Sequence, residues 1–267
     1  MDLNGVAEFT PATGATWRDG DAWLGGGTWL FSQPQPRLTR LLDLHAFGWT
    51  PVRESGDGVL IAATCTLAEL ARWPLARTGR ASAAALARQC CHALLGSFKV
   101  HNVATVGGNI CLSLPAGPMT SFASALDGIA LLRGPGDRRR SMPVAAFVTG
   151  DGRNTLHAGE LLTHVWLPPA ALSARTAFRQ LSLSPVGRSA VLVIARREHG
   201  GQTVVTVTAS TPRPVQLRFP VPPTGAEALA GLAAAAPAYL DDPHGNATWR
   251  AAMTRRLVAE AVEELAG

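Results

Sequence analysis

The sequence lacks the patterns that metal clusters, membrane spans and secretion signals require. Its four cysteines, Cys65, Cys90, Cys91 and Cys111, have no C-x-x-C spacing and no histidines in register. We therefore expect no zinc or iron–sulfur site in this chain, and reduced thiols. The sequence has no run of about 18 consecutive apolar residues, so we expect no membrane-spanning segment. The opening MDLNGVAEFTPATGATWRDG has no basic segment followed by an apolar one, so we expect no signal peptide and a cytoplasmic protein.

Lysine is nearly absent as well. Lys99 is the only lysine, so the net charge of +5 comes almost entirely from arginine. The one dense basic run, residues 138–140, follows RGPGD and has no interleaved aromatics, which is typical of an exposed hairpin tip. We therefore expect no nucleic-acid partner. With 267 residues, 47% of them hydrophobic, the chain can form one large domain or two smaller ones.

Periodicity and punctuating residues predict mixed helices and strands. Thr66 followed by Glu69 matches a capping box at a helix start, and Pro168 with Pro169 ends a strand. Alternating apolar segments then predict an antiparallel meander, and we place a domain boundary after Pro169. The predicted strands cover residues 58–63, 160–168, 176–183, 190–198 and 203–210, the predicted hairpin covers 128–144, and the predicted helices cover 81–95, 121–127 and 249–265.

Two glycine-containing segments, AWLGGGTWLF and HNVATVGGNICLSLPAGP, raise the same question. Each has the pattern of a short strand that runs into glycines. Backbone N–H groups at such a place approach a ligand without an intervening Cβ and form a cradle for phosphate oxygens. Neither segment matches G-x-G-x-x-G or a P-loop. We expect both to hold one pyrophosphate, with hydrogen bonds from the side chains of Thr28, Thr105 and Asn109.

The residues LGGGTWL and NVATVGGNICLSLPAG resemble the FAD-binding (medium) subunit of molybdenum hydroxylases, the xanthine dehydrogenase and carbon monoxide dehydrogenase family. Relatives typically read A-G-G-T-[DS]-L at the first segment, and R-N-x-A-T-I-G-G-N-[IL] then S-P-A-G-D at the second. The similarity continues through TLAEL, MPVAAFVTGDGRNTLHAGELLTHVWLP, FRQLSLSPVGRSAVLVIA and DDPHGNATWRAAMTRRL, so it covers nearly the whole chain.

The resemblance implies an α+β fold in two domains. Residues 1–170 would form a two-part FAD-binding domain of the vanillyl-alcohol-oxidase (PCMH) type, and residues 171–267 a small α+β domain like the C-terminal domain of the carbon monoxide dehydrogenase flavoprotein. The backbone of residues 25–29 and 105–109 would hold the FAD pyrophosphate. Arg179 matches a basic residue near the isoalloxazine. The cofactor-binding residues implied by the resemblance are Leu24, Gly25, Gly26, Gly27, Thr28, Trp29, Leu95, Thr105, Val106, Gly107, Gly108, Asn109, Leu161, Leu162 and Arg179.

Two positions depart from the family pattern. Trp29 replaces a small polar residue, and Pro118 replaces an aspartate. Because positions 28 and 29 are Thr and Trp, and not the histidine that attaches FAD in some related folds, we expect non-covalent FAD.

The function implied is electron transfer. The FAD subunit would pass electrons from the [2Fe–2S] clusters of a small partner subunit, fed by a molybdenum-containing large subunit with molybdopterin, to an acceptor such as NAD or oxygen. No catalytic acid, base or nucleophile is predicted in this chain. The alternative is a scaffold subunit of the same kind of complex that has lost FAD, an interpretation that Trp29 and Pro118 motivate.

Overall fold

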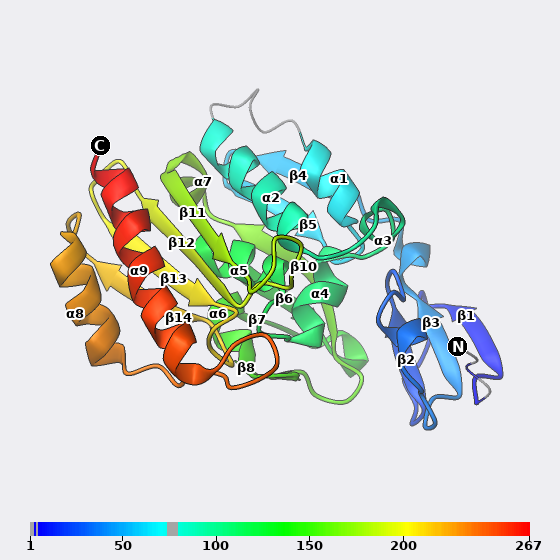
Figure 1. Ribbon diagram of the computed structural model, residues 1–267. Coiled ribbons are helices and arrows are strands. Elements are labelled where there is room, and N and C mark those ends of the chain that lie inside the picture. The colour runs from blue at the N-terminus through cyan, green and yellow to red at the C-terminus, as the bar shows by residue number, and fades with distance from the viewer. Residues whose placement is uncertain (1–2, 4, 74–79) are drawn as a thin grey trace.

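A computed structural model describes residues 3, 5–73 and 80–267. The described residues do not include residues 1, 2, 4 and 74–79. The first three of these belong to the opening segment, where we expect no signal peptide. The described chain forms three sheets of three or more strands and one small two-stranded sheet, and Figure 1 shows how helices and strands are arranged around them. The mixture of helices and sheets is the α+β class that the sequence predicts.

The first sheet is a small parallel one, in the order β1-β3-β2. It consists of β1 (Glu8–Pro11), β3 (Arg40–Asp43) and β2 (Asp21–Leu24), and it lies at one side of the molecule in Figure 1. Arg40 on β3 donates from Nε to Asp21 Oδ1 on β2 at 2.8 Å. This buried pair holds the pKa of the Asp21 carboxyl below its ordinary value and fastens β2 beside β3.

A five-stranded antiparallel sheet forms the centre, in the order β4-β5-β10-β6-β7. Its strands are β4 (Val52–Ser55), β5 (Gly58–Ala62), β10 (Leu161–Leu167), β6 (Ile129–Arg133) and β7 (Arg139–Pro143). The predicted hairpin is confirmed as β6 and β7. The predicted strand before Pro168 is confirmed as β10.

Helices α1 (Leu67–Arg72), α2 (Ala81–Ala93), α4 (Val106–Leu112) and α5 (Pro118–Ala125) accompany this sheet. The capping box of α1 is confirmed, since Thr66 Oγ1 accepts from Glu69 N and Glu69 Oε2 accepts from Thr66 N at 2.8 Å. The predicted helix at 81–95 is confirmed as α2. The shorter elements are η1 (Leu30–Ser32), η2 (Leu44–Phe47), α3 (Phe98–His101), η4 (Pro135–Asp137), α6 (Val144–Phe147), β8 (Val148–Gly150), β9 (Arg153–Asn154) and α7 (Pro169–Ser173).

The predicted meander is confirmed as part of a four-stranded antiparallel sheet. It contains β11 (Arg175–Leu181), β12 (Val191–Arg197), β13 (Thr203–Thr208) and β14 (Val215–Phe219). The sequence predicts neither β14 nor helix α8 (Gly225–Ala235). The last helix, α9 (Ala247–Ala266), confirms the predicted helix at 249–265.

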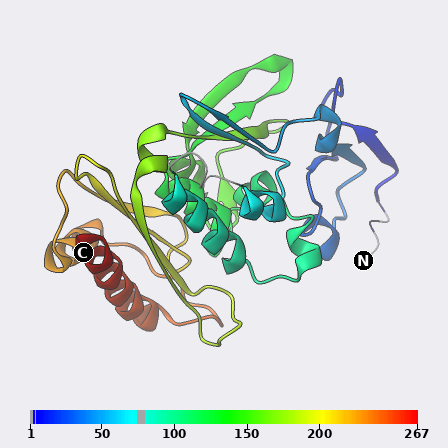
Figure 2. The same cartoon turned by 90° about the horizontal axis from the view of Figure 1, so that it is seen from above.

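This last sheet is apolar on both faces. Val191, Val193 and Ala195 of β12 face α9, where they pack with Val258 and Ala261. The alternate residues Leu192 and Ile194 join the larger core of the preceding part of the chain. Figure 2 shows the result, with α9 (red) on one face of the sheet and the green and blue-green helices toward the other. The division after residue 170 stays a prediction.

Candidate functional site

The first glycine segment follows the carboxyl end of β2 and touches the second segment. An ideal Cβ on Gly26 would lie 1.7 Å from the carbonyl oxygen of Val103, and one on Gly25 would lie 2.9 Å from Thr105 Oγ1. Only glycine allows this close approach of two backbones. The N–H groups of residues 25–28 donate no hydrogen bond to any other described residue. They are free to bind an anion.

The second glycine segment differs from the prediction. Its glycines do not follow a strand but lie in the first turn of α4. Thr105 is the N-cap, and its Oγ1 accepts from Gly108 N at 3.1 Å. A helix forms because this cap and the surrounding packing outweigh the β-propensity of the Val-Ala-Thr-Val run. The expectation of a strand here is wrong.

The start of α4 has few donors to spare. Val106 N donates to Cys65 O at 2.8 Å, Gly107 N donates to Ala63 O at 2.9 Å, and Asn109 N donates to Thr105 O at 3.0 Å. The side chain of Asn109 is also engaged, because its Oδ1 accepts from Met119 N at the start of α5. Of the two segments, the first therefore offers the free backbone donors, and the second forms a wall.

A cavity of about 520 Å³ joins the two segments. Its wall is largely apolar, with glycines and a few polar groups on one side. The lining residues are Trp23, Leu24, Gly25, Gly26, Gly27, Thr28, Trp29, Leu30, Ala93, Leu94, Leu95, Val100, Ala104, Thr105, Gly108, Asn109, Cys111, Leu112, Leu114, Ala116, Gly117 and Arg188.

Most of the predicted site residues meet at this cavity. Leu95, far from both glycine segments in the sequence, joins them there. Trp29 also lines the cavity and is 44% exposed. The predicted residues that the structure brings together are Leu24, Gly25, Gly26, Gly27, Thr28, Trp29, Leu95, Thr105, Gly108 and Asn109.

Five predicted residues do not line this cavity. Val106 is buried in the core, and a Cβ on Gly107 would lie 2.4 Å from the Cβ of Ala63, so both face the protein interior. Leu162 also belongs to the main core. Leu161 lines a separate cavity of about 180 Å³. Their predicted roles at the cofactor stay predictions.

Arg179, the fifth of these residues, is held by helix α9. Its Nη1 lies next to a carboxylate oxygen of Glu264, and its Nε lies 3.6 Å from Glu260 Oε2. Its predicted place beside the isoalloxazine stays a prediction. Pro118, where the family pattern has aspartate, is buried as the first residue of α5, a position that proline favours.

Several residues that line the cavity are not predicted from the sequence. Leu94, Val100, Leu112, Leu114 and Ala116 are apolar residues without a distinguishing pattern. Arg188 lies between β11 and β12, about 80 positions beyond the second glycine segment in the sequence. No local signal marks it, because the pairing of two strands brings it to the cavity.

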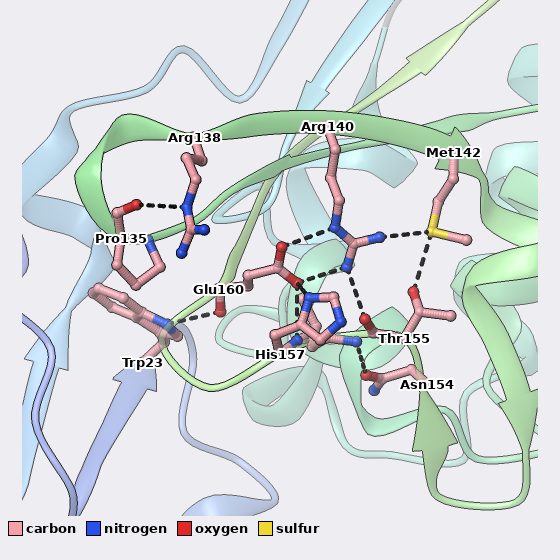
Figure 3. A network of polar contacts seen from close by, with 10 residues as sticks. Trp23, Pro135, Arg138, Arg140, Met142, Asn154, Thr155, His157 and Glu160 are labelled. Atoms are coloured by element: carbon pink, nitrogen blue, oxygen red, sulfur yellow. Dashed lines mark hydrogen bonds and ion pairs between the residues drawn. The ribbon is translucent and has the colours of Figure 1, made fainter.

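A polar network fixes the position of β2 relative to the central sheet (Figure 3). Trp23, which lines the cavity, donates from Nε1 to Glu160 O at 3.0 Å. Glu160 accepts from Arg140 Nε at 2.8 Å and from His157 N at 2.8 Å. Chiefly because of Arg140, the pKa of the Glu160 carboxyl is lowered to about 2. The network thus holds a charged pair at neutral pH and steadies the strand that leads into the first glycine segment.

Cys111 contributes no charge to the cavity. Burial raises the pKa of its thiol to about 12, so the thiol stays protonated at neutral pH. A thiolate nucleophile is therefore not available at this wall, and Cys111 acts as a small apolar residue.

The volume and the chemical character of the cavity wall suit a flavin dinucleotide. Its volume is in the range of about 300–1,000 Å³ found for ligand sites. The free N–H groups of residues 25–28 suit a pyrophosphate, and the apolar walls suit aromatic rings. A Cβ on Gly108 would meet only Thr105 Oγ1, at 3.0 Å, so the exposed Gly108 leaves space on the cavity side of α4.

Comparison with known proteins agrees with this geometry. The family described as the FAD binding domain in molybdopterin dehydrogenase matches residues 11–170. The FAD-subunit of nicotinate dehydrogenase from Eubacterium barkeri is 28% identical over 134 residues, which cover 49% of this chain and 43% of that protein. The match therefore spans less than half the length of that relative.

Solved structures resemble the chain over nearly its whole length. A chain of quinoline 2-oxidoreductase from Pseudomonas putida 86 superimposes with a TM-score of 0.82 and 18% identity, over 100% of this chain and 98% of that one. A chain of carbon monoxide dehydrogenase from Hydrogenophaga pseudoflava gives a TM-score of 0.82 and 21% identity, over 98% of each chain. At these identities the likeness establishes the fold alone.

Proposed function

Since the chain belongs to the family of FAD-binding domains of molybdopterin dehydrogenases, we propose that it is the electron-transfer flavoprotein subunit of a molybdenum hydroxylase. The observation that carries the proposal is that residues 25–28, whose N–H groups have no hydrogen-bond acceptor among the described residues, line the same cavity as the start of α4. Bound FAD would supply reversible one- and two-electron chemistry.

The chain's own residues would bind and orient this cofactor. The N–H groups of residues 25–28 would donate to the pyrophosphate, and the hydroxyl of Thr105 lies on the same side of the cavity. Leu94, Leu95 and Val100 would exclude water from a ring system. The proposal requires no catalytic proton donor or nucleophile from this chain. For electron transfer, the protein has to bind the flavin and provide its electrostatic environment, and acid–base catalysis matters less.

The proposal also includes partner subunits for this chain. One relative is called the FAD-subunit of its dehydrogenase, a name that implies further subunits. Among the described residues, no group of three or more His, Cys, Asp and Glu is placed to hold a metal, and no helix has both the length and the apolar character for crossing a membrane. We assign [2Fe–2S] clusters to a small partner subunit and molybdopterin to a large one, with an electron acceptor such as NAD or oxygen.

The test is cofactor content. The chain, purified or reconstituted with FAD, is expected to bind one FAD non-covalently, and acid precipitation is expected to release the flavin into the supernatant. Isothermal titration gives the stoichiometry. Chains co-expressed with the neighbouring genes are expected to transfer electrons from the substrate of the complex to a dye, while the lone chain is not. A colourless protein that takes up no FAD would instead favour the scaffold alternative.

A further inference from the structure

One charged side chain lines the cavity. Arg188 is half-buried at the cavity wall, and every other lining residue is apolar or uncharged. No carboxylate among the described residues lies within ion-pair distance of Arg188. The cavity wall therefore has one positive charge without a counter-charge among the described residues, and this charge favours a ligand that has a negative group near it.

The backbone that follows Arg188 is fixed by hydrogen bonds. The next residue, Ser189, accepts from Gln180 Nε2 at 2.8 Å. Ala190 N donates to Leu181 O at 2.9 Å, and the carbonyl of Ala190 accepts from Nη1 of the buried Arg250. These bonds close the base of the loop at residues 182–190 against β11 and α9. Arg188 therefore lies next to the fixed base of the loop. The tip of the loop is in solvent, since Val186 there is 79% exposed.

Arg179 does not provide this charge. It has two carboxylate partners on α9, Glu260 and Glu264, and it does not line the cavity. A charge that is already paired has a weaker field at a distance. Of the arginines at positions 179 and 188, the unpaired one faces the cavity.

We propose that Arg188 stabilises the negative charge that the isoalloxazine ring of the bound flavin acquires on reduction. The inference rests on the proposed function and adds a residue to it. Two-electron reduction with uptake of one proton leaves one negative charge on the ring system. A nearby guanidinium binds this form more tightly than the neutral oxidised form, and the difference raises the reduction potential.

The ring is a better match for Arg188 than the pyrophosphate. The pyrophosphate has its donors in the free N–H groups of residues 25–28, at the end of β2. Arg188 comes from the loop between β11 and β12 of the four-stranded sheet. Ala116 and Gly117, which also line the cavity, follow Pro115, whose carbonyl oxygen accepts from Ala209 N just after β13 of that sheet. Adenine is uncharged in both redox states, so the ring is the remaining part of FAD that gains charge.

The test compares reduction potentials of the FAD-loaded chain, measured by equilibration with reference dyes. In Arg188→Gln we expect the affinity for reduced FAD to fall about tenfold more than that for oxidised FAD, which corresponds to a potential lower by about 30 mV for a two-electron couple. Arg188→Lys is expected to retain part of the potential. Arg213→Gln, which removes an exposed arginine of the same sheet region, is the matched control and is expected to leave it unchanged.

The outcomes separate the possibilities. An unchanged potential in Arg188→Gln overturns the inference, and if the affinity for oxidised FAD falls at the same time, the arginine contacts the pyrophosphate. A shift in Arg179→Gln without one in Arg188→Gln also overturns it and favours the residue implied by the resemblance. Failure of the wild-type chain to bind FAD removes the proposed function itself, and the wild-type titration alone reveals that failure. Circular dichroism and melting of each variant exclude a folding defect.

Discussion

At the scale of single residues, the two adjacent glycines of α4 have different tasks. Gly107 faces the interior, where a Cβ would lie 2.4 Å from the Cβ of Ala63. Gly108 is exposed to the cavity, where a Cβ would meet only the hydroxyl of Thr105 at 3.0 Å. Neither has a positive φ, so the contrast is one of space and not of backbone strain.

Because of this contrast, a substitution at Gly107 serves as the control for the same substitution at Gly108. We expect Gly108→Val to fold with a melting temperature near that of the wild type and to lose FAD affinity by at least tenfold, because the side chain would occupy the cavity. Gly107→Val is expected to destabilise the fold by about 1–3 kcal/mol through overpacking. Thermal melting followed by circular dichroism and FAD titration separate the two effects. Wild-type FAD affinity in a well-folded Gly108→Val variant would place the cofactor elsewhere.

Gly26 is a poor position at which to test FAD binding by substitution. A Cβ there would lie 1.7 Å from the backbone oxygen of Val103, so a side chain would push the two segments apart before it met a ligand. Loss of FAD in Gly26→Val would therefore report the packing of the segments as well as the cofactor site.

At the scale of elements, the polar network of Glu160 joins β2 to the hairpin of the central sheet. The pKa of its carboxyl is about 2 in the folded chain, against an ordinary value of 4.5. A lowered carboxyl pKa adds stability that is fully present above about pH 4.5 and is lost as the pH falls toward 2. Arg140 is one-third exposed, which reduces the contribution through solvent screening.

We expect Glu160→Gln to lower the free energy of unfolding by about 2 kcal/mol at pH 7. The gap to the wild type is expected to narrow as the pH falls from 4.5 toward 2, because Glu160 takes up a proton in the unfolded chain over this range while it stays ionised in the folded one. Urea unfolding at a series of pH values measures the gap. Glu8→Gln is the matched control, since the Arg18–Glu8 pair is half exposed on both sides and is expected to contribute less than about 1 kcal/mol. A gap independent of pH would mean that the pair does not stabilise the fold through its charge.

The sequence predicts those elements whose signals are local. The capping box of Thr66 and Glu69 and the hairpin at residues 128–144 need only neighbouring residues, and both are present in the structure. Helix α4 escapes prediction because its β-branched lead-in favours a strand, while its turn depends on contacts of Gly107 with the distant Ala63. Arg188 escapes for the same reason, since strand pairing and Arg250 bring it to the cavity.

The pair Leu161 and Leu162 shows a further limit. A family pattern indicates which stretch approaches a cofactor, but successive residues of a strand point to opposite faces. In β10, Leu162 enters the main core and Leu161 faces a smaller cavity. A pattern match at a strand therefore does not fix which side chain reaches a ligand.

At the scale of the whole molecule, the core crosses the predicted boundary after residue 170. Leu192 and Ile194 of β12 pack into the core of the preceding part, and Ser121 on α5 is hydrogen-bonded to Thr208 on β13 at 2.7 Å. The cavity, too, takes Arg188 from beyond the boundary. The two parts thus share both their packing and their site.

We therefore expect the chain to unfold in one cooperative transition, with equal calorimetric and van't Hoff enthalpies. FAD at 100 times its Kd is expected to stabilise that whole transition by about 2.7 kcal/mol, because the two parts share a core and Arg188 of the cavity wall comes from the second part. The fragment of residues 1–170 is expected to lose FAD affinity, since it lacks Arg188 and leaves the partners of Leu192 and Ile194 uncovered. Scanning calorimetry with and without FAD, and titration of the fragment, measure both effects. Two separate transitions, of which FAD shifts only one, would instead establish independent domains, and the site would then belong to the first part alone.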